Sequence, residues 1–155
     1  MLCVGKLREP FWRDAAAEYL KRLSPFGKIR VLEIDEARLP DTPKPAQIAA
    51  ALGQEGKRIL EKLPKGAHVT ALCVEGSEFT SEQLAGQLEK TAGDGVSELA
   101  FIIGGAWGLS PEVKSAAKTR LSLSRLTFPH QLARVLLLEQ LYRAFSILSN
   151  GKYHK

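Results

Sequence analysis

Short apolar segments alternate with longer segments of helical periodicity along this 155-residue chain. Parallel strands need a crossover connection between them, and an amphipathic helix that packs on the sheet supplies it. The alternation therefore predicts a single α/β domain over residues 1–155, with a mostly parallel sheet flanked by helices. We expect strands at residues 2–4, 29–34, 68–74, 101–103 and 121–124, and helices at residues 11–23, 48–63, 81–92 and 131–149.

A glycine pair follows the apolar segment at residues 101–103. Because glycine has no side chain to obstruct a ligand, Gly104 and Gly105 predict a binding site at the carboxyl end of this strand. Further along the chain, leucine and serine alternate over residues 121–124, which predicts a strand that turns through Pro129 into a long helix. The carboxyl ends of neighbouring parallel strands meet at one edge of a sheet, so the two loops predict one shared crevice.

The helix expected at residues 131–149 is apolar on almost every side. Such a helix needs cover on more than one side. In a small domain the sheet can supply one cover and a second subunit the other, so the pattern predicts a homodimer. The apolar residues are Leu132, Val135, Leu136, Leu137, Leu138, Leu141, Phe145, Ile147 and Leu148.

Composition narrows the class of protein and its partners. With 45% hydrophobic residues, no apolar run of membrane-spanning length and no signal-peptide pattern at the amino terminus, we expect a cytoplasmic protein without membrane contact. The formal net charge of +5 favours a polyanionic partner such as RNA, because lysine and arginine gain affinity by releasing counterions from phosphates. Cys3 and Cys73 are expected to be reduced, small and buried.

The motifs of several enzyme classes are absent from the sequence. The segment 104–108 lacks the glycine spacing of a dinucleotide-binding loop, and no phosphate-binding loop of the Walker type is completed after it. The chain also lacks a serine nucleophile elbow and a pair of histidines at metal-ligand spacing. Nicotinamide and nucleoside-triphosphate enzymes are therefore disfavoured, and no metal site is expected.

Four polar side chains in the last third of the chain are candidates for chemistry. His130 follows Pro129 at the mouth of the expected crevice, where it either packs at the helix start or contacts a substrate. Arg134 lies one helical turn beyond His130, so the two can face the same side. Tyr153 and His154 offer an aromatic face for stacking a base and an imidazole, although a chain end is normally frayed.

Other polar and aromatic residues have simpler interpretations. Glu139 and Arg143 are one helical turn apart and are expected to pair with each other. His68 opens a strand and is expected to be an edge or loop residue. Trp107 is either a core aromatic or a lid over the crevice, and the sequence does not separate the two.

These residues resemble the SPOUT class of knotted RNA methyltransferases. Within that class they are similar to the H-type enzymes, which methylate N3 of a pseudouridine in large-subunit (23S) ribosomal RNA. The likeness covers nearly the whole chain, but the first strand begins several residues late and Cys73 stands where an acidic residue is common after Leu72. The matching segments are 103–105, 108–109, 123–124, 126–130, 134–136, 139–144 and 153–155.

The resemblance implies that the last strand and helix thread through a loop to form a C-terminal trefoil knot, which general topology rules disfavour. It also implies S-adenosylmethionine as the cofactor and a dimer with each site near the interface. The residues expected to hold the cofactor are Leu72, Gly104, Gly105, Leu123, Ser124, Arg125, Leu126, Thr127 and Phe128.

Methylation at N3 requires loss of the proton that this atom carries. By position, we assign His130 and His154 as candidate proton acceptors or orienting groups, Arg134 as an anion or phosphate contact, and Tyr153 as a stacking group. The alternative is a basic dimer that binds RNA or the ribosome without chemistry. It accounts for the charge, but it gives no reason for a glycine-lined crevice beside a histidine and an arginine.

Overall fold

The computed structural model describes residues 1–149, and its core is a five-stranded sheet in the order β2-β1-β4-β3-β5. Each neighbouring pair of strands is parallel, so the prediction of a parallel sheet is confirmed. Because all strands point the same way, their carboxyl ends share one edge. The strands are β1 (Leu2–Val4), β2 (Leu32–Ile34), β3 (His68–Glu78), β4 (Leu99–Ile103) and β5 (Thr119–Ser122).

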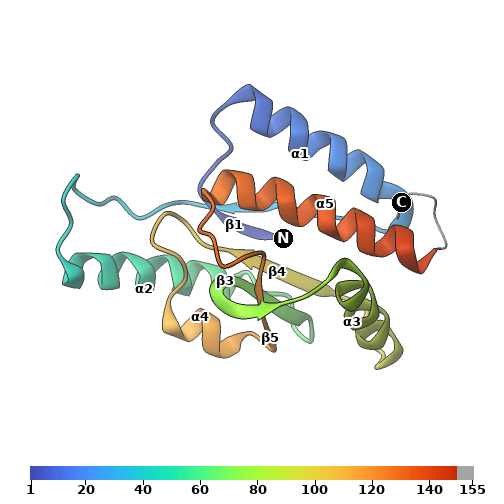
Figure 1. Cartoon of the computed structure of the whole chain (residues 1–155). Coiled ribbons are helices and arrows are strands. Elements are labelled where there is room, and N and C mark those ends of the chain that lie inside the picture. The colour runs from blue at the N-terminus through green and yellow to red at the C-terminus, as the bar shows by residue number, and fades with distance from the viewer. Residues whose placement is uncertain (150–155) are drawn as a thin grey trace.

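Helices lie on both faces of the sheet (Figure 1). One apolar core joins the sheet to α1 (Pro10–Leu23), α3 (Ser81–Gly93) and α5 (His130–Leu148). The other core contains residues of α2 (Pro45–Glu61) and α4 (Pro111–Ala116). The connection from β1 therefore runs over one face and the connection from β4 over the other, although the two strands are neighbours. Ligands of open α/β sheets bind at such switch points, outside the carboxyl ends of the strands.

Proline and hydroxyl side chains define where several helices begin. Pro10, Pro45 and Pro111 each occupy a first helical position, where no backbone N–H is needed. The sequence analysis did not predict α4, which has only six residues. Its signal was Ser110 followed by Pro111: the Ser110 hydroxyl accepts a hydrogen bond from the backbone N–H of Val113 at 3.4 Å. The short 3₁₀ turn η1 (Ser24–Phe26) follows α1.

Several strand boundaries differ from the prediction, and β4 and β5 each begin two residues earlier than expected, at Leu99 and Thr119. β2 is shorter than the expected 29–34, and β5 ends at Ser122 instead of Ser124. β3 continues beyond the expected Val74 to Glu78, and its last residues pair with β5 again after a register shift. Gly76 permits this contact, because a Cβ at this position would lie 2.7 Å from the carbonyl carbon of Leu121. The extension carries β3 side chains past the sheet edge and toward the loops that follow β4 and β5.

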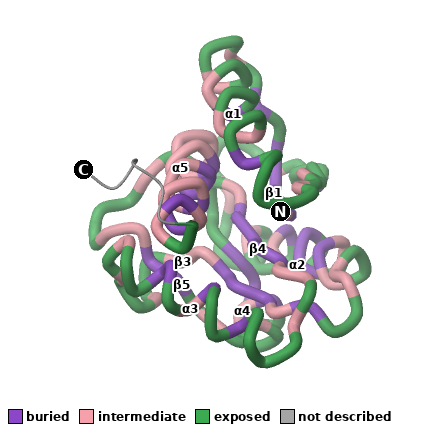
Figure 2. The backbone as a smooth tube through the Cα atoms, turned by 90° about the vertical axis from the view of Figure 1, so that its right-hand side faces the viewer, coloured by how far each residue is buried: buried purple, intermediate pink, exposed green. Residues whose placement is uncertain are grey.

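Helix α5 is covered from more directions than the sequence suggested. No residue between Gln131 and Ile147 is exposed, and α5 is purple and pink over this length in Figure 2. The flanking helices α1 and α3 pack against it, so they supply much of the cover that was assigned to a second subunit. Leu137 and Leu141 are buried inside the subunit. Leu132 and Leu136 are only half-buried and belong to neither apolar core of the described chain.

Candidate active site

A cavity of about 710 Å³ lies at the carboxyl edge of the sheet, between residues 72–75 of β3 and the loops that follow β4 and β5. The glycine-bearing and serine-bearing loops therefore do share one crevice, as expected. All of the residues assigned to the cofactor line it except Arg125. The Arg125 side chain is 95% exposed and lies 3.7 Å from Glu78, outside the crevice. Leu72, Ile103, Leu121, Leu123 and Phe128 make much of the lining apolar.

The two adjacent glycines do different things in the β4 loop. A Cβ on Gly104 would lie 2.2 Å from the carbonyl oxygen of Gly108, so the backbone of the following turn fills this space. That turn is closed by a 3.1 Å hydrogen bond from the Gly108 N–H to the Gly105 carbonyl, and Gly108 has a φ of +84°. A Cβ on Gly105 would instead lie 3.1 Å from Cγ1 of Val4, toward β1. Trp107, at the tip of the turn, is 53% exposed and lines the crevice, so it is not a core aromatic.

Serine hydroxyls fix the loop after β5. The Ser122 hydroxyl donates to the Ser124 carbonyl at 2.9 Å, and the Ser124 hydroxyl accepts from the Leu126 N–H at 3.1 Å. These bonds hold the backbone of residues 122–126 in a defined shape beside the cavity. Leu126 and Thr127 are exposed and yet line the crevice, which places them at its rim.

The charged groups of the crevice are few among the described residues. Lys114 of α4 donates a hydrogen bond to Glu75, which lowers the pKa of that carboxyl group. Burial raises the pKa of the Cys73 thiol, and the Glu75 carboxylate acts in the same direction. The thiol is thus protonated at neutral pH and a weak nucleophile, which argues against covalent catalysis at Cys73. Cys3 and Cys73 are both free, as expected, but only Cys3 is buried: Cys73 is half-buried because it lines the crevice.

Glu75 and Lys114 were not identified from the sequence. The departure at Cys73 drew attention to a missing acidic group, and the structure places a carboxylate on the same strand two residues later. Cys73 and Glu75 both line the crevice, although β3 is irregular between Leu72 and Ser77. An acidic residue two positions along a crevice strand was the signal that could have found it.

His130 and Arg134 end in different surroundings. His130 lines the crevice, and its Nε2 comes within 3.2 Å of where a Cβ on Gly5 would lie. The Glu36 carboxylate reaches within 3.1 Å of the same point. The Arg134 side chain is only 3% exposed: it donates to the Gly5 carbonyl at 2.8 Å and to Glu33 at 2.9 Å. Arg134 is absent from the crevice lining, so in this structure it fixes the end of β1 and does not face the crevice.

Of the remaining candidate residues, the structure describes His68 but not Tyr153 and His154. His68 forms a 2.9 Å hydrogen bond with the Thr119 hydroxyl on the neighbouring strand, and burial lowers its pKa. These contacts agree with its assignment as a strand-edge residue. Tyr153 and His154, which were also candidates, lie outside the described residues. Within residues 1–149, no group of three or more histidine, cysteine, aspartate or glutamate side chains could hold a metal ion.

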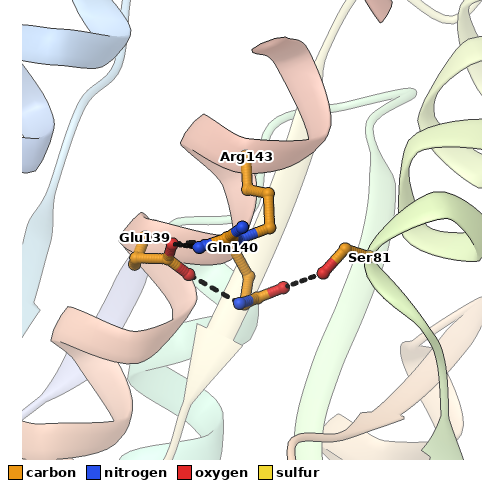
Figure 3. Close-up of polar contacts among 4 residues, drawn as sticks. All are labelled: Ser81, Glu139, Gln140 and Arg143. Carbon is orange, nitrogen blue, oxygen red and sulfur yellow. Dashed lines mark hydrogen bonds and ion pairs between the residues drawn. The ribbon is translucent and has the colours of Figure 1, made fainter. Parts of the chain in front are cut away.

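A polar network on α5 reaches Ser81 at the start of α3 (Figure 3). Arg143 donates to Glu139 at 2.6 Å, which confirms the predicted pair. Gln140 donates to the other Glu139 oxygen at 2.5 Å and accepts from the Ser81 hydroxyl at 2.9 Å. The Glu139 side chain is 14% exposed and that of Arg143 is 29% exposed. This pair is better shielded from solvent than an ordinary surface pair, and the network ties the start of α3 to the middle of α5.

A buried carboxylate holds the loop that follows β2. Glu55 of α2 is 8% exposed, and one of its oxygens accepts the Ala37 N–H at 2.8 Å. Burial raises the pKa of Glu55, although the Ala37 bond and Arg58 oppose the rise. The loop carries Glu36, which packs beside His130 over Gly5. The protonation state of Glu55 is therefore coupled to the stability of this edge of the site.

Replacing Glu55 with glutamine is expected to reduce the pH dependence of the free energy of unfolding. A raised folded pKa means that the contribution of Glu55 is fully present below the ordinary value of 4.5 and is lost as the pH rises through the folded value. Glutamine can still accept the Ala37 N–H, so the variant should gain on the natural protein between about pH 4 and about pH 7. Denaturant titrations at both pH values measure the gain. A difference that does not change with pH would contradict the assignment.

Comparison with known proteins gives a consistent answer over the whole chain. Residues 1–154 match the family model described as "Predicted SPOUT methyltransferase". The chain belongs to the SPOUT methyltransferase family. It is 48% identical over 155 residues to the protein named "Ribosomal RNA large subunit methyltransferase H" of Bifidobacterium animalis subsp. lactis, covering all of this chain and 98% of that protein. Proteins of the same name from Streptococcus thermophilus and Carboxydothermus hydrogenoformans are 46% and 43% identical, with the same coverage.

Membership of the SPOUT family supports a functional role for the crevice. The resemblance identified from residues 103–105 and 126–130 is confirmed, and those residues are the ones that line the cavity. The family is one of methyltransferases, so the crevice at the switch point is its candidate catalytic centre. No helix within residues 1–149 is both long and apolar enough to cross a membrane.

Proposed function

We propose that this SPOUT protein transfers the methyl group of S-adenosylmethionine to N3 of a pseudouridine in large-subunit ribosomal RNA, in the cytoplasm. The observation that carries the proposal is the glycine-walled crevice at the carboxyl ends of β3, β4 and β5, in a chain whose full-length relatives are named for large-subunit ribosomal RNA methylation. The net charge of +5 supports a polyanionic substrate.

The described residues fit S-adenosylmethionine. A volume of about 710 Å³ is within the range of sites that enclose a small molecule, and the apolar lining suits a purine ring. The backbone cradle at Gly104 and the serine-fixed loop at residues 122–126 offer main-chain groups to a base edge. When bound, the cofactor supplies an electrophilic methyl group on a sulfonium. We assign its binding to the crevice-lining residues and leave out Arg125, whose side chain points into solvent.

The transfer requires an acceptor for the N3 proton and fixed positions for the target base. His130 is the candidate at the crevice, because its Nε2 faces the point above Gly5 where Glu36 also arrives. His154 remains a second candidate acceptor, and Tyr153 a candidate for stacking on the base. For Arg134 we propose a positioning role. Its hydrogen bonds to Glu33 and to the Gly5 carbonyl fix the backbone of Gly5, next to which the His130 side chain packs.

We also propose that the protein works as a homodimer and carries the family's trefoil knot. Leu132 and Leu136 lie one turn apart on α5, half-buried and outside both apolar cores, and the Glu139–Arg143 pair continues the same stripe. Leu126, which is 70% exposed, and Trp107 add apolar surface at the crevice rim. A second copy that covers this stripe would bring its own residues beside the crevice.

A Leu136→Asp variant is expected to weaken the dimer by roughly 100-fold or more, because a buried unpaired charge costs several kcal/mol. Leu136 is a better position than Leu137 or Leu141, which the apolar pattern also suggested. Both of these are buried within the subunit, so a charge introduced there would unfold it. Sedimentation at micromolar concentration measures the change, and Leu32→Asp on the edge strand β2 is the control, since Leu32 is also partly exposed at 40%. A variant that sediments like the natural protein would place the interface elsewhere.

The test of the function is transfer of label from methyl-labelled S-adenosylmethionine. Protein-free large-subunit ribosomal RNA, isolated large subunits and whole ribosomes are each incubated with the protein. An enzyme labels at least one of the three substrates, whereas a binding protein without chemistry retains RNA and labels none. Binding without label would therefore favour the alternative of a basic RNA-binding dimer.

A further inference from the structure

A second hollow lies beside the crevice, at the carboxyl ends of β1 and β2. Its volume is about 610 Å³, and Gly5, Lys6, Arg8, Asp35, Glu36 and Arg38 are among the residues that line it. In Figure 1 the loop between β2 and α2 extends beyond the same edge of the sheet as the start of α5. The cofactor assignment does not use this hollow, because none of the residues that line it also lines the crevice.

The hollow has three cationic side chains against two carboxylates, an excess of one positive charge, and the cations are exposed. Lys6, Arg8 and Arg38 are all exposed. Arg8 approaches Glu36 only at 3.7 Å, and its side chain is 77% exposed, so this pair contributes little and can open. Within residues 1–149, Lys6 and Arg38 form no ion pair, although Asp35 and Glu36 line the same hollow. Exposed cations without a fixed partner can bind phosphate without first breaking a protein contact.

Hydrogen bonds from α2 and α5 fix the loops that carry these cations. Glu55 accepts the Ala37 N–H, and Arg58 donates to the Asp35 carbonyl at 2.8 Å. On the β1 side, the Arg8 N–H donates to the side chain of Gln131 in α5 at 3.1 Å. The hollow is therefore preformed, and a ligand would not bear the cost of ordering its walls.

Gly5 separates the hollow from the crevice. It has a φ of +82°, and the Glu36 carboxylate and His130 Nε2 converge where its side chain would be. Glu36 belongs to the hollow and His130 to the crevice, so a ligand that spans both must pass over this point. An RNA strand has the matching chemistry, with anionic phosphates next to a base that an enzyme can turn out of the stack.

We propose that this basic hollow binds the RNA phosphates that flank the target base, with Lys6, Arg8 and Arg38 as the phosphate contacts, so that the base crosses Gly5 into the crevice beside His130. The proposal deepens the proposed function and rests on it for the identity of the base. It assigns substrate binding to the β1 and β2 loops, and cofactor binding to β3 and the β4 and β5 loops.

The test is a double variant, Lys6→Ala with Arg38→Ala, compared with Lys28→Ala and Lys65→Ala. The control pair is equally exposed but lies next to the amino ends of β2 and β3, at the opposite edge of the sheet. Filter binding measures the affinity for large-subunit ribosomal RNA at several salt concentrations, and calorimetry measures the affinity for S-adenosylmethionine. Removing two phosphate contacts should weaken RNA binding by roughly 10-fold or more and reduce the salt slope by about 1.4 to 1.8.

We expect the weaker RNA binding and the smaller salt slope in the Lys6 and Arg38 double variant but not in the Lys28 and Lys65 double variant. The affinity for S-adenosylmethionine should be unchanged in both. Equal RNA affinity and salt slope in the two double variants would overturn the hollow as the RNA site, whether or not the natural protein transfers methyl groups. RNA binding that depends on Lys6 and Arg38 without methyl transfer by the natural protein would support the hollow and reject the enzyme. The two proposals therefore fail separately.

Discussion

A Gly104→Val protein is expected to lose roughly 10-fold to 100-fold in affinity for S-adenosylmethionine. Any Cβ at this position would lie 2.2 Å from the Gly108 carbonyl oxygen, so the turn over residues 105–108 must move away from the crevice. The sequence suggested that the new side chain would occupy ligand space, but the structure shows that it first strikes the backbone of the loop. Overpacking of this kind costs about 1–3 kcal/mol, and each 1.4 kcal/mol is a factor of ten in the dissociation constant.

The neighbouring glycine supplies the matched control. A Cβ on Gly105 would lie 3.1 Å from one methyl group of Val4, which is a side-chain contact that can adjust. Gly105→Ala should therefore keep most of the affinity that Gly104→Ala loses, when calorimetry is restricted to variants with a cooperative thermal transition. If folded Gly104→Ala and Gly104→Val proteins bind S-adenosylmethionine like the natural protein, the β4 loop is not part of the cofactor site.

The length of α5 decides where the end of the chain can act. The helix has 19 residues, so Ser149 lies about 28 Å along the helix from His130 at the crevice. The residues from 150 to 154 can span at most about 18 Å, since an extended chain covers roughly 3.5 Å per residue. The main chain of residues 150–154 is thus shorter than the helix between His130 and Ser149. We propose on this ground that Tyr153 and His154 act at the crevice of a second copy.

Deleting residues 153–155 is expected to leave S-adenosylmethionine affinity nearly intact while methyl transfer falls by roughly 100-fold or more, as when a positioned acid or base is removed. The variant keeps every residue of the two apolar cores described within residues 1–149, so we expect the fold to persist. Calorimetry and single-turnover transfer of label measure the two effects separately. A tail-deleted protein with full activity would exclude Tyr153 and His154 from catalysis.

Mixed dimers test whether the end of the chain works across the interface. One chain carries the deletion of residues 153–155 and the other carries Gly104→Val. The intact crevice and the intact chain end then belong to different subunits, and the limited reach of residues 150–154 predicts that activity returns in the mixed dimer. Inactive mixed dimers would mean that each chain end serves its own subunit, which would place the target base far from His130.

Much of the fold could be predicted because its signals are local. Apolar runs such as residues 101–103 become strands, and the helical spacing of residues 11–23 becomes α1 with Pro10 at its first position. The crevice followed from the rule that loops at the carboxyl ends of neighbouring strands share an edge. A helix of six residues, α4, has too few turns to show a period, and only Ser110 and Pro111 marked it.

The roles of single side chains depended on contacts between distant parts of the chain. Arg134 looked like an anion contact because it lies one turn from His130, but the end of β1 and Glu33 capture its guanidinium group. The meeting of Glu36 with His130 depends on the conformation of Gly5, which no periodicity encodes. The cover of α5 was underestimated for the same reason, since α1 and α3 close around it only in the folded subunit.

The most direct test of the central claim compares two forms of the same large-subunit ribosomal RNA, one natural and isolated from cells that lack this protein, and one transcribed in vitro from unmodified nucleotides. Each is assembled or presented in the form that accepts label, incubated with the protein and S-adenosylmethionine, and digested to nucleosides for mass spectrometry. We predict a methylated pseudouridine with the methyl group on N3 in the natural RNA, and no methylated nucleoside in the transcript, which contains no pseudouridine. Methylation of uridine in the transcript, or no methylation of any RNA by a folded protein that binds S-adenosylmethionine, would contradict the account.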